Sequence, residues 1–150
     1  MSVPSPPTTP SPFSAATEEP AMSRSLPTPS KISLPFWESC KAENMQIQRC
    51  EDCGTYAFYP VYICPECASR KLAWTPVSGR GTIHTFTVAA KSSFDSDEPL
   101  VVALIELEEG AMMVSNVKTA TPETLSIGSP VRLTYEKVSD EITLPMFEPA

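Results

Sequence analysis

Cys50-Glu51-Asp52-Cys53-Gly54 and Cys64-Pro65-Glu66-Cys67 form two Cys-x-x-Cys pairs that ten residues separate. Two such pairs can place four thiolates at the corners of a tetrahedron, the geometry that Zn²⁺ adopts in closed structural sites. Gly54 suits the tight turn that points backbone N–H groups at the sulfurs. We therefore predict a zinc ribbon that holds one structural zinc ion, with the ligands Cys50, Cys53, Cys64 and Cys67.

Besides a structural zinc, these cysteines could form a redox dithiol, disulfides or a catalytic zinc site. A redox dithiol needs only one pair, and it usually lies in a βαβ pattern that is missing here. Disulfides need an oxidising compartment, and the N-terminal sequence lacks the charged and apolar regions of a signal peptide. A catalytic zinc keeps an open position, which four sulfur ligands do not leave. The metal is therefore expected to hold structure, and reduced cysteines without a signal peptide favour the cytoplasm.

The N-terminal segment is dominated by proline, serine, threonine and alanine. Nine of the 17 prolines lie within residues 1–35, and the larger apolar residues of segment 1–30 are Phe13, Met22 and Leu26. Such a segment buries too little surface to offset its ordering entropy, so we predict a disordered tail over residues 1–33. A Pro-rich docking peptide is the alternative. The longest apolar run, Leu100–Ile105, falls far short of the roughly 20 residues that a membrane span needs.

The rest of the chain predicts a mainly β protein in three parts: a short N-terminal helix within 34–47, a zinc ribbon at 48–76 and a five-stranded OB-fold barrel at 77–150. Pro35 suits a first helical turn, so we expect a helix from about Pro35 to Asn44. The expected ribbon strands are Met45–Arg49, Thr55–Ile63 and Lys71–Trp74.

The expected barrel strands begin after Gly79 and Gly81, two glycines that suggest a bulge or a sharp coil at the entrance of the first strand. One of these strands is unusual, because Leu100–Leu107 is apolar on both faces at first and alternates only later. The full set comprises Thr82–Ala90, Leu100–Leu107, Ala111–Val117, the alternating stretch Val131–Glu136 and Ile142–Leu144.

Charge is unevenly distributed along the chain. The formal charge is −7, and four thiolates with one zinc ion would make it about −9. Residues 95–150 hold eleven acidic residues, whereas the interval between Glu66 and Asp95 holds none. That interval contains the single histidine and several basic residues: His84, Arg70, Lys71, Arg80 and Lys91. A local basic surface on an acidic chain suits a small polyphosphate better than a nucleic acid, and a chance cluster of solvated side chains explains it equally well.

Taken together, these motifs resemble one family: acyl-CoA-associated proteins that join a short N-terminal helix, a rubredoxin-like zinc ribbon and an OB-fold. The resemblance covers about residues 34–150. It is carried by the segments Pro35–Glu38, Ile47–Gly54, Cys64–Cys67, Ser78–Thr82, Val101–Gly110 and Thr143–Pro145. Two positions depart from the family pattern. Ala68 stands where the second knuckle often has glycine, and His84 stands where an aromatic residue is more usual.

The resemblance implies a non-catalytic accessory subunit of a thiolase-like enzyme. Members of the family occur beside thiolases, thiolase-type aldolases, acetyltransferases and enoyl-CoA hydratases, where they scaffold the complex and share its CoA channel. CoA carries phosphates, so we expect Arg70, Lys71, Arg80 and Lys91 to meet the CoA ester of the partner's substrate.

Two functions of other classes compete with this interpretation. Zinc ribbons and OB barrels also bind single-stranded nucleic acid, but the acidic charge argues against it here. An enzyme that acts alone would have Cys40 as nucleophile and His84 as its base. A cysteine on the inner face of a helix is more often a core residue, and the sequence shows no paired-carboxylate motif or phosphate loop.

Overall fold

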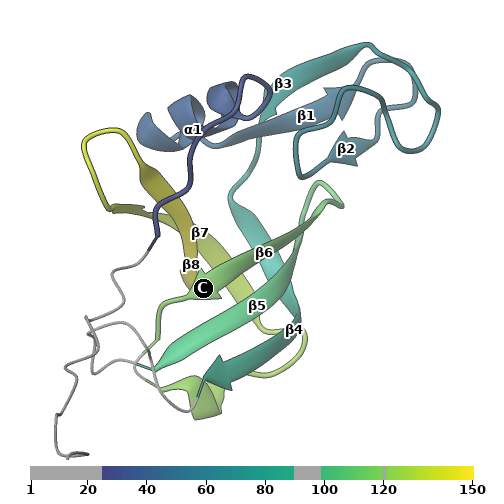
Figure 1. The fold of residues 1–150 in the computed structure, drawn as a ribbon. Helices are drawn as coiled ribbons and strands as arrows, with labels where there is room; N and C mark the ends of the chain where they lie inside the picture. The colour runs from purple at the N-terminus through teal and green to yellow at the C-terminus, as the bar shows by residue number, and fades with distance from the viewer. Residues whose placement is uncertain (1–24, 90–98, 120) are drawn as a thin grey trace, which may run out of the picture.

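The computed structural model describes residues 25–89, 99–119 and 121–150. Within these ranges the chain forms one α-helix and a ribbon of short strands, followed by a barrel of longer strands (Figure 1). The elements, in chain order, are α1 (Leu34–Lys41), β1 (Gln46–Cys50), β2 (Tyr56–Ala57), β3 (Leu72–Pro76), β4 (Arg80–Ala89), β5 (Leu100–Leu107), β6 (Met112–Val117), the 3-10 helix η1 (Pro122–Thr124), β7 (Pro130–Lys137) and β8 (Thr143–Pro149). The tail predicted over residues 1–33 lies mostly outside the described residues. So does Lys91.

The ribbon is a three-stranded antiparallel sheet in the order β2-β1-β3. This confirms the predicted three strands, but the expectation of a strand over Thr55–Ile63 is wrong beyond Ala57. Pro60 has no N–H for a ladder, and the N–H of Val61 donates to Gln48 Oε1 at 2.7 Å instead of to a neighbouring strand. Residues 58–63 are therefore a loop that a buried side chain of β1 holds in place.

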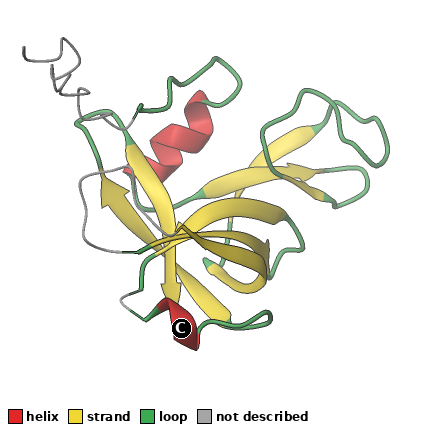
Figure 2. Cartoon of the chain, turned by 60° about the horizontal axis from the view of Figure 1, so that its bottom comes forward, coloured by secondary structure: helices red, strands yellow, loops and turns green. Residues whose placement is uncertain are grey.

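The C-terminal part is a closed barrel with the strand order β4-β5-β6-β8-β7, as predicted for an OB-fold. Every neighbouring pair is antiparallel except β6 and β8, which run parallel. Figure 2 shows the strands of the chain in yellow and its helices in red. The last strand is longer than the predicted Ile142–Leu144, because Pro145 pairs with Tyr135 inside it rather than ending it. Burial of Thr143, Pro145 and Phe147 along one face outweighs the ladder N–H that the proline lacks.

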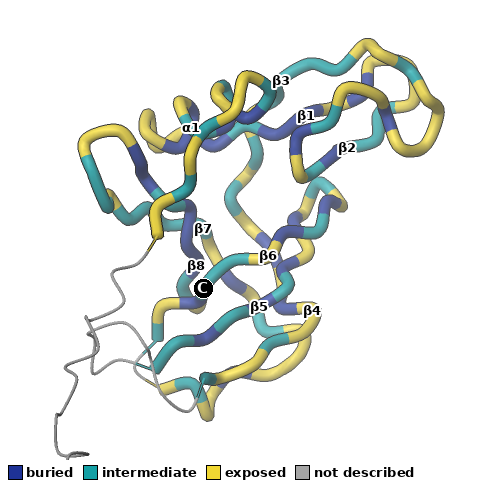
Figure 3. The backbone as a smooth tube through the Cα atoms, viewed as in Figure 1, coloured by how far each residue is buried: buried dark blue, intermediate teal, exposed yellow. Residues whose placement is uncertain are grey.

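Helix α1 joins the ribbon to the barrel. It ends at Lys41 rather than at the predicted Asn44, because Glu43 turns the chain with a φ of +53° and lets it enter β1. Phe36 and Cys40 of the helix are buried in one core with residues of β1 and the barrel (Figure 3). The Tyr135 hydroxyl also accepts a hydrogen bond of 2.9 Å from the Met45 N–H, which ties β7 to the start of the ribbon.

Strand β4 crosses the barrel with one irregularity. Its register with β5 shifts between Ile83 and Thr85, so the irregularity in the ladder lies at His84. Of the two alternatives predicted for the entrance, a bulge or a sharp coil, the structure has a bend at Gly79, whose φ is +76°. Gly81 has a different role, because a Cβ there would lie 2.7 Å from the Glu106 carbonyl oxygen and 2.8 Å from Ile105 Cγ2. The glycine therefore allows β4 and β5 to approach closely.

No helix in these ranges has the length and apolar character that crossing a bilayer requires.

Replacing Gly81 by alanine tests this close approach. We expect Gly81→Ala to lower the free energy of unfolding by about 1–3 kcal/mol, because the new methyl group meets backbone that cannot move aside. The measurement is urea unfolding followed by circular dichroism. Thr82→Ala, at an exposed neighbouring position, is the control and should change the value by no more than about 0.5 kcal/mol. Equal effects of the two changes would contradict the argument.

Candidate metal centre

The four cysteines of the two pairs come together at the tip of the ribbon. Their Sγ atoms all lie within 4.8 Å of one another, with 3.5 Å between Cys50 and Cys67 and 3.6 Å between Cys53 and Cys64. Four sulfurs bonded to one zinc ion at about 2.3 Å would be about 3.8 Å apart. The donor set and its spacing therefore fit a tetrahedral zinc ion held by four thiolates.

The two knuckles have the same local structure. Gly54 donates its N–H to the Cys50 carbonyl at 2.9 Å, and Ala68 donates its N–H to the Cys64 carbonyl at 3.0 Å. Both residues have a positive φ, of +78° at Gly54 and +58° at Ala68. The left-handed conformation is natural for glycine and strained for alanine, so the second knuckle pays a small conformational cost for the same turn.

Neighbouring groups shift the pKa values of the sulfurs in opposite directions. Hydrogen bonding with the Thr55 side chain lowers the pKa of Cys53 to about 6. The Ser69 N–H favours the thiolate of Cys67, but the sulfurs of Cys53 and Cys50 outweigh it and raise the pKa of Cys67 to about 12. A bound divalent cation would supply the positive charge that four neighbouring thiolates need.

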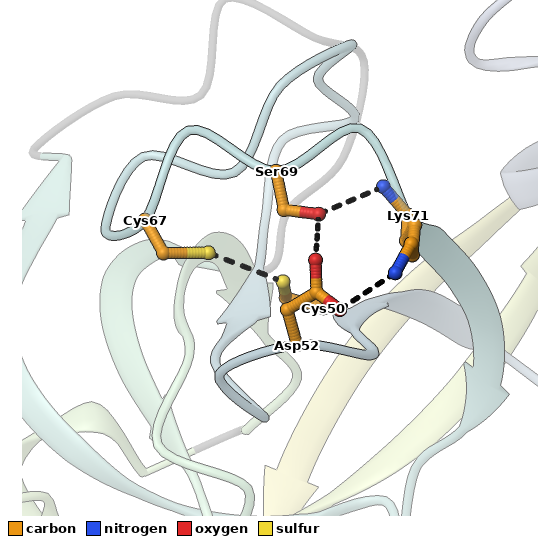
Figure 4. Close-up of polar contacts among 5 residues, drawn as sticks. All are labelled: Cys50, Asp52, Cys67, Ser69 and Lys71. Carbon is orange, nitrogen blue, oxygen red and sulfur yellow. Dashed lines mark hydrogen bonds and ion pairs between the residues drawn. The ribbon is translucent and has the colours of Figure 1, made fainter.

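A second set of contacts surrounds the sulfurs (Figure 4). Asp52, inside the first knuckle, accepts hydrogen bonds from Ser69 Oγ at 2.6 Å and from Lys71 Nζ at 3.1 Å, both just after the second knuckle. Ser69 first and Lys71 second lower the pKa of Asp52, which keeps its carboxylate ionised. The Asp52 carboxylate thus links the two knuckles independently of the sulfurs. The Cys-x-x-Cys spacing does not reveal this link, because Ser69 is brought to Asp52 only by folding.

The basic residues predicted to meet CoA lie in different surroundings. Lys71 is paired with Asp52, and Arg80 donates to both oxygens of Glu108, at 2.8 Å from Nε and 2.9 Å from Nη2. Arg70 is exposed on the ribbon. The strand register also places Arg132 of β7 opposite Arg80, which the basic interval of the sequence did not include. The described part of this interval therefore does not form one uninterrupted basic surface.

Cys40 and His84, the candidate nucleophile and base, differ in their exposure to solvent. Cys40 is fully buried, and burial raises the pKa of its thiol to about 12. His84 is exposed at the bulge of β4. A buried thiol with a raised pKa is a poor nucleophile, and an exposed imidazole is not placed to activate it.

The ribbon and the barrel each match a known protein family. Residues 37–73 match the profile described as "ChsH2, rubredoxin-like zinc ribbon domain", and residues 74–136 match the profile described as "ChsH2, C-terminal OB-fold domain". A "DUF35 domain-containing scaffold protein" of Methanocaldococcus jannaschii is 35% identical over 116 residues, which cover 74% of this chain and 82% of that protein. The chain belongs to the ChsH2/DUF35 family. The resemblance seen in the sequence is thereby confirmed.

Other relatives of the family show what kinds of protein contain this unit. A "Probable enoyl-CoA hydratase alpha subunit" of Thermomonospora curvata is 38% identical over 117 residues, but the match spans 77% of this chain and only 37% of that protein. The solved structure "Ltp2-ChsH2(DUF35) aldolase" superposes with a TM-score of 0.74 at 34% identity, covering 83% of this chain and 98% of that chain. The family unit thus occurs both as part of longer subunits and within an aldolase structure.

The Asp52 link predicts a kinetic effect on metal retention. We expect Asp52→Asn to release zinc to a chelator about tenfold faster than the unchanged chain, because groups around metal ligands commonly affect affinity on this scale. The measurement is zinc transfer to a colorimetric chelator under native conditions. Glu51→Gln removes the same charge from the neighbouring exposed position and serves as the matched control. Identical release from both variants would mean that charge alone, and not the link to Ser69 and Lys71, matters.

Proposed function

We propose that this protein is a non-catalytic accessory subunit that assembles with a thiolase-like or related acyl-CoA enzyme. The observation that carries the proposal is the superposition on the chain of the "Ltp2-ChsH2(DUF35) aldolase" structure, which this protein covers almost from end to end at 34% identity. The family relatives named as scaffold proteins support the same role. A tetrathiolate site of free cysteines needs a reducing compartment, so we place this function in the cytoplasm.

The chemistry of the described residues supports a role without catalysis. Zinc held by Cys50, Cys53, Cys64 and Cys67 would have all four positions filled by protein sulfurs, so it would stabilise the ribbon and bind no substrate. The buried thiol of Cys40 is held protonated by its surroundings. The relatives named as hydratase subunits are longer proteins, so their activity can belong to parts that this chain does not match.

Nucleic-acid binding is disfavoured by how the basic side chains are used. Within the described residues, several of them are paired with carboxylates on the same surface: Lys71–Asp52, Arg80–Glu108, Lys118–Glu136, Arg132–Glu148 and Lys137–Asp140. A phosphate backbone would have to displace many of these acids at once against a net charge of −7, whereas a small ligand meets only one or two of the pairs.

We further propose that Arg70, Lys71, Arg80 and Lys91 contribute to a CoA site shared with the partner. The pairs of Arg80 with Glu108 and of Lys71 with Asp52 are solvent-exposed, and such pairs contribute little to stability. A phosphate can therefore compete for these cations when a partner excludes water around them. Arg132, opposite Arg80 in the barrel, would add a second guanidinium to that part of the site.

The accessory role predicts that the protein works only in a complex. We expect the tagged full chain, isolated from its own host, to co-elute in gel filtration with an acyl-CoA enzyme subunit identified by mass spectrometry. The purified chain alone should not turn over acyl-CoA esters. Cys67→Ser, which removes one sulfur of the metal cluster, should lose both zinc and the co-eluting subunit. Turnover by the isolated chain would refute the proposal.

The CoA proposal predicts a separate effect on substrate binding. In the isolated complex, Arg80→Glu should raise the KM for the CoA ester about tenfold or more, because it places a negative charge where a phosphate is expected to bind. Lys137→Glu reverses a charge that is also paired with an acid, at the far end of β7, and should leave KM unchanged. An unchanged KM in both variants would remove Arg80 from the CoA site without affecting the accessory role.

A further inference from the structure

Strand β5 carries apolar side chains on both of its faces. Its inward positions, Val101, Ala103, Ile105 and Leu107, are each no more than 2% exposed and form part of the core. Two outward positions, Val102 and Leu104, are also aliphatic, and the first charged outward residue is Glu106. Only the inward face is needed to fill a barrel, so the barrel itself does not require aliphatic residues on the outer face.

The outer face continues from β5 onto its neighbours. Leu104 lies opposite Val114 of β6, and Val114 is 63% exposed although it stands in the middle of a strand. On the other side, β4 places Thr85 opposite Leu104. Met112 of β6 is also partly exposed on this face. The strands therefore present a largely aliphatic surface centred on Leu104 and Val114, with the exposed Glu106 at its edge opposite Met112.

A groove adjoins this surface where the helix, the ribbon and the barrel meet. Among the described residues β6 and β8 pair at a single position, Val117 with Phe147, and a cavity of about 190 Å³ lies between Met113–Asn116 and Leu144–Met146. Phe36 and Trp37 of α1 and Phe58 and Tyr59 of the ribbon loop complete its lining, which includes no charged side chain. Val114 belongs to both the groove and the outer face, so the two form one continuous surface.

Two aromatic side chains of the groove, Tyr59 and Trp37, lack full burial or a hydrogen-bond partner in the described part of the free chain. Tyr59 is 52% exposed. The Nε1 atom of Trp37 is buried and has no hydrogen-bond partner among the described residues. A buried donor without an acceptor costs free energy, and tryptophan and tyrosine are the residues that most often anchor protein interfaces. The exposed Tyr59 ring beside an uncharged groove lining favours a partner that brings apolar groups.

We propose that the groove and the outer face of β5 and β6 form the docking surface for the acyl-CoA enzyme subunit, an inference that rests on the proposed accessory function. The occupant is an uncharged, apolar segment of that subunit, because the groove lining and the residues Thr85, Val102, Leu104, Met112 and Val114 offer no charge to pair. A second copy of this chain is a poorer occupant, because two molecules with a formal charge of −7 repel each other.

The test compares two exposed aliphatic residues. Val114→Asp places a charge at the centre of the surface, whereas Ile127→Asp makes a similar change at a 72% exposed residue of the loop before β7. The probe is the acyl-CoA enzyme subunit that co-elutes with the full chain, purified and titrated against each variant by calorimetry. We expect Val114→Asp to weaken binding at least tenfold and Ile127→Asp to leave it unchanged, with both variants keeping zinc and native circular dichroism.

Trp37 gives a second, independent readout. Trp37→Phe keeps an aromatic side chain in the groove lining but makes it smaller, so it should weaken the complex severalfold. In a Trp74→Phe background, Trp37 is the remaining tryptophan and its fluorescence should change when the subunit binds. An indole with a purely structural role would show neither the loss of affinity nor the change in emission.

The possible results distinguish a failure of the docking surface from a failure of the proposed accessory function. Equal affinity for the unchanged chain and both variants overturns this docking surface while leaving the accessory role intact. A homodimer that Val114→Asp dissociates overturns the choice of occupant. If the unchanged chain binds no acyl-CoA enzyme subunit, the proposed function fails, and the docking proposal fails with it.

Discussion

The grouping of four sulfurs within 4.8 Å is the constraint on which the N-terminal half of the structure depends. The ribbon sheet contains a strand of only two residues, and the loop from β2 to β3 is longer than any of its strands. So small a sheet buries little apolar surface of its own, and a metal held by four thiolates compensates for that deficit. The Asp52 contacts with Ser69 and Lys71 add a second connection between the same two knuckles.

The ribbon is also held from its other end by the shared core. Phe36, Met45 and Ile47 are each no more than 2% exposed and belong to the same cluster as the barrel interior. Helix α1 is too short to be stable alone, so its conformation depends on this packing. Helix, ribbon and barrel therefore share a core, and residues of all three line the groove at their junction.

Surface charge and surface shape suggest separate tasks for different regions. The acidic residues pair with most of the basic ones on the barrel and ribbon, as with Arg80 and Glu108. None of the ion pairs found among the described residues involves the outer face around Leu104 and Val114. An accessory protein needs a place to bind its enzyme and, where a substrate is shared, a place to meet that substrate. The apolar surface suits the first task and the arginines of β4 and β7 suit the second.

The sequence by itself determined the metal cluster, the order of helix, ribbon and barrel, and the extent of Leu100–Leu107, because ligand spacing and alternation are local properties. It could not locate the bulge at His84, the early end of β2 or the passage of β8 through Pro145, since each depends on how distant strands pair. Only the tertiary structure brought Ser69 to Asp52, placed Arg132 opposite Arg80 and joined Val114 to the groove of Trp37. Contacts between residues far apart in the chain are decided by the packing of the whole molecule, which no local pattern records.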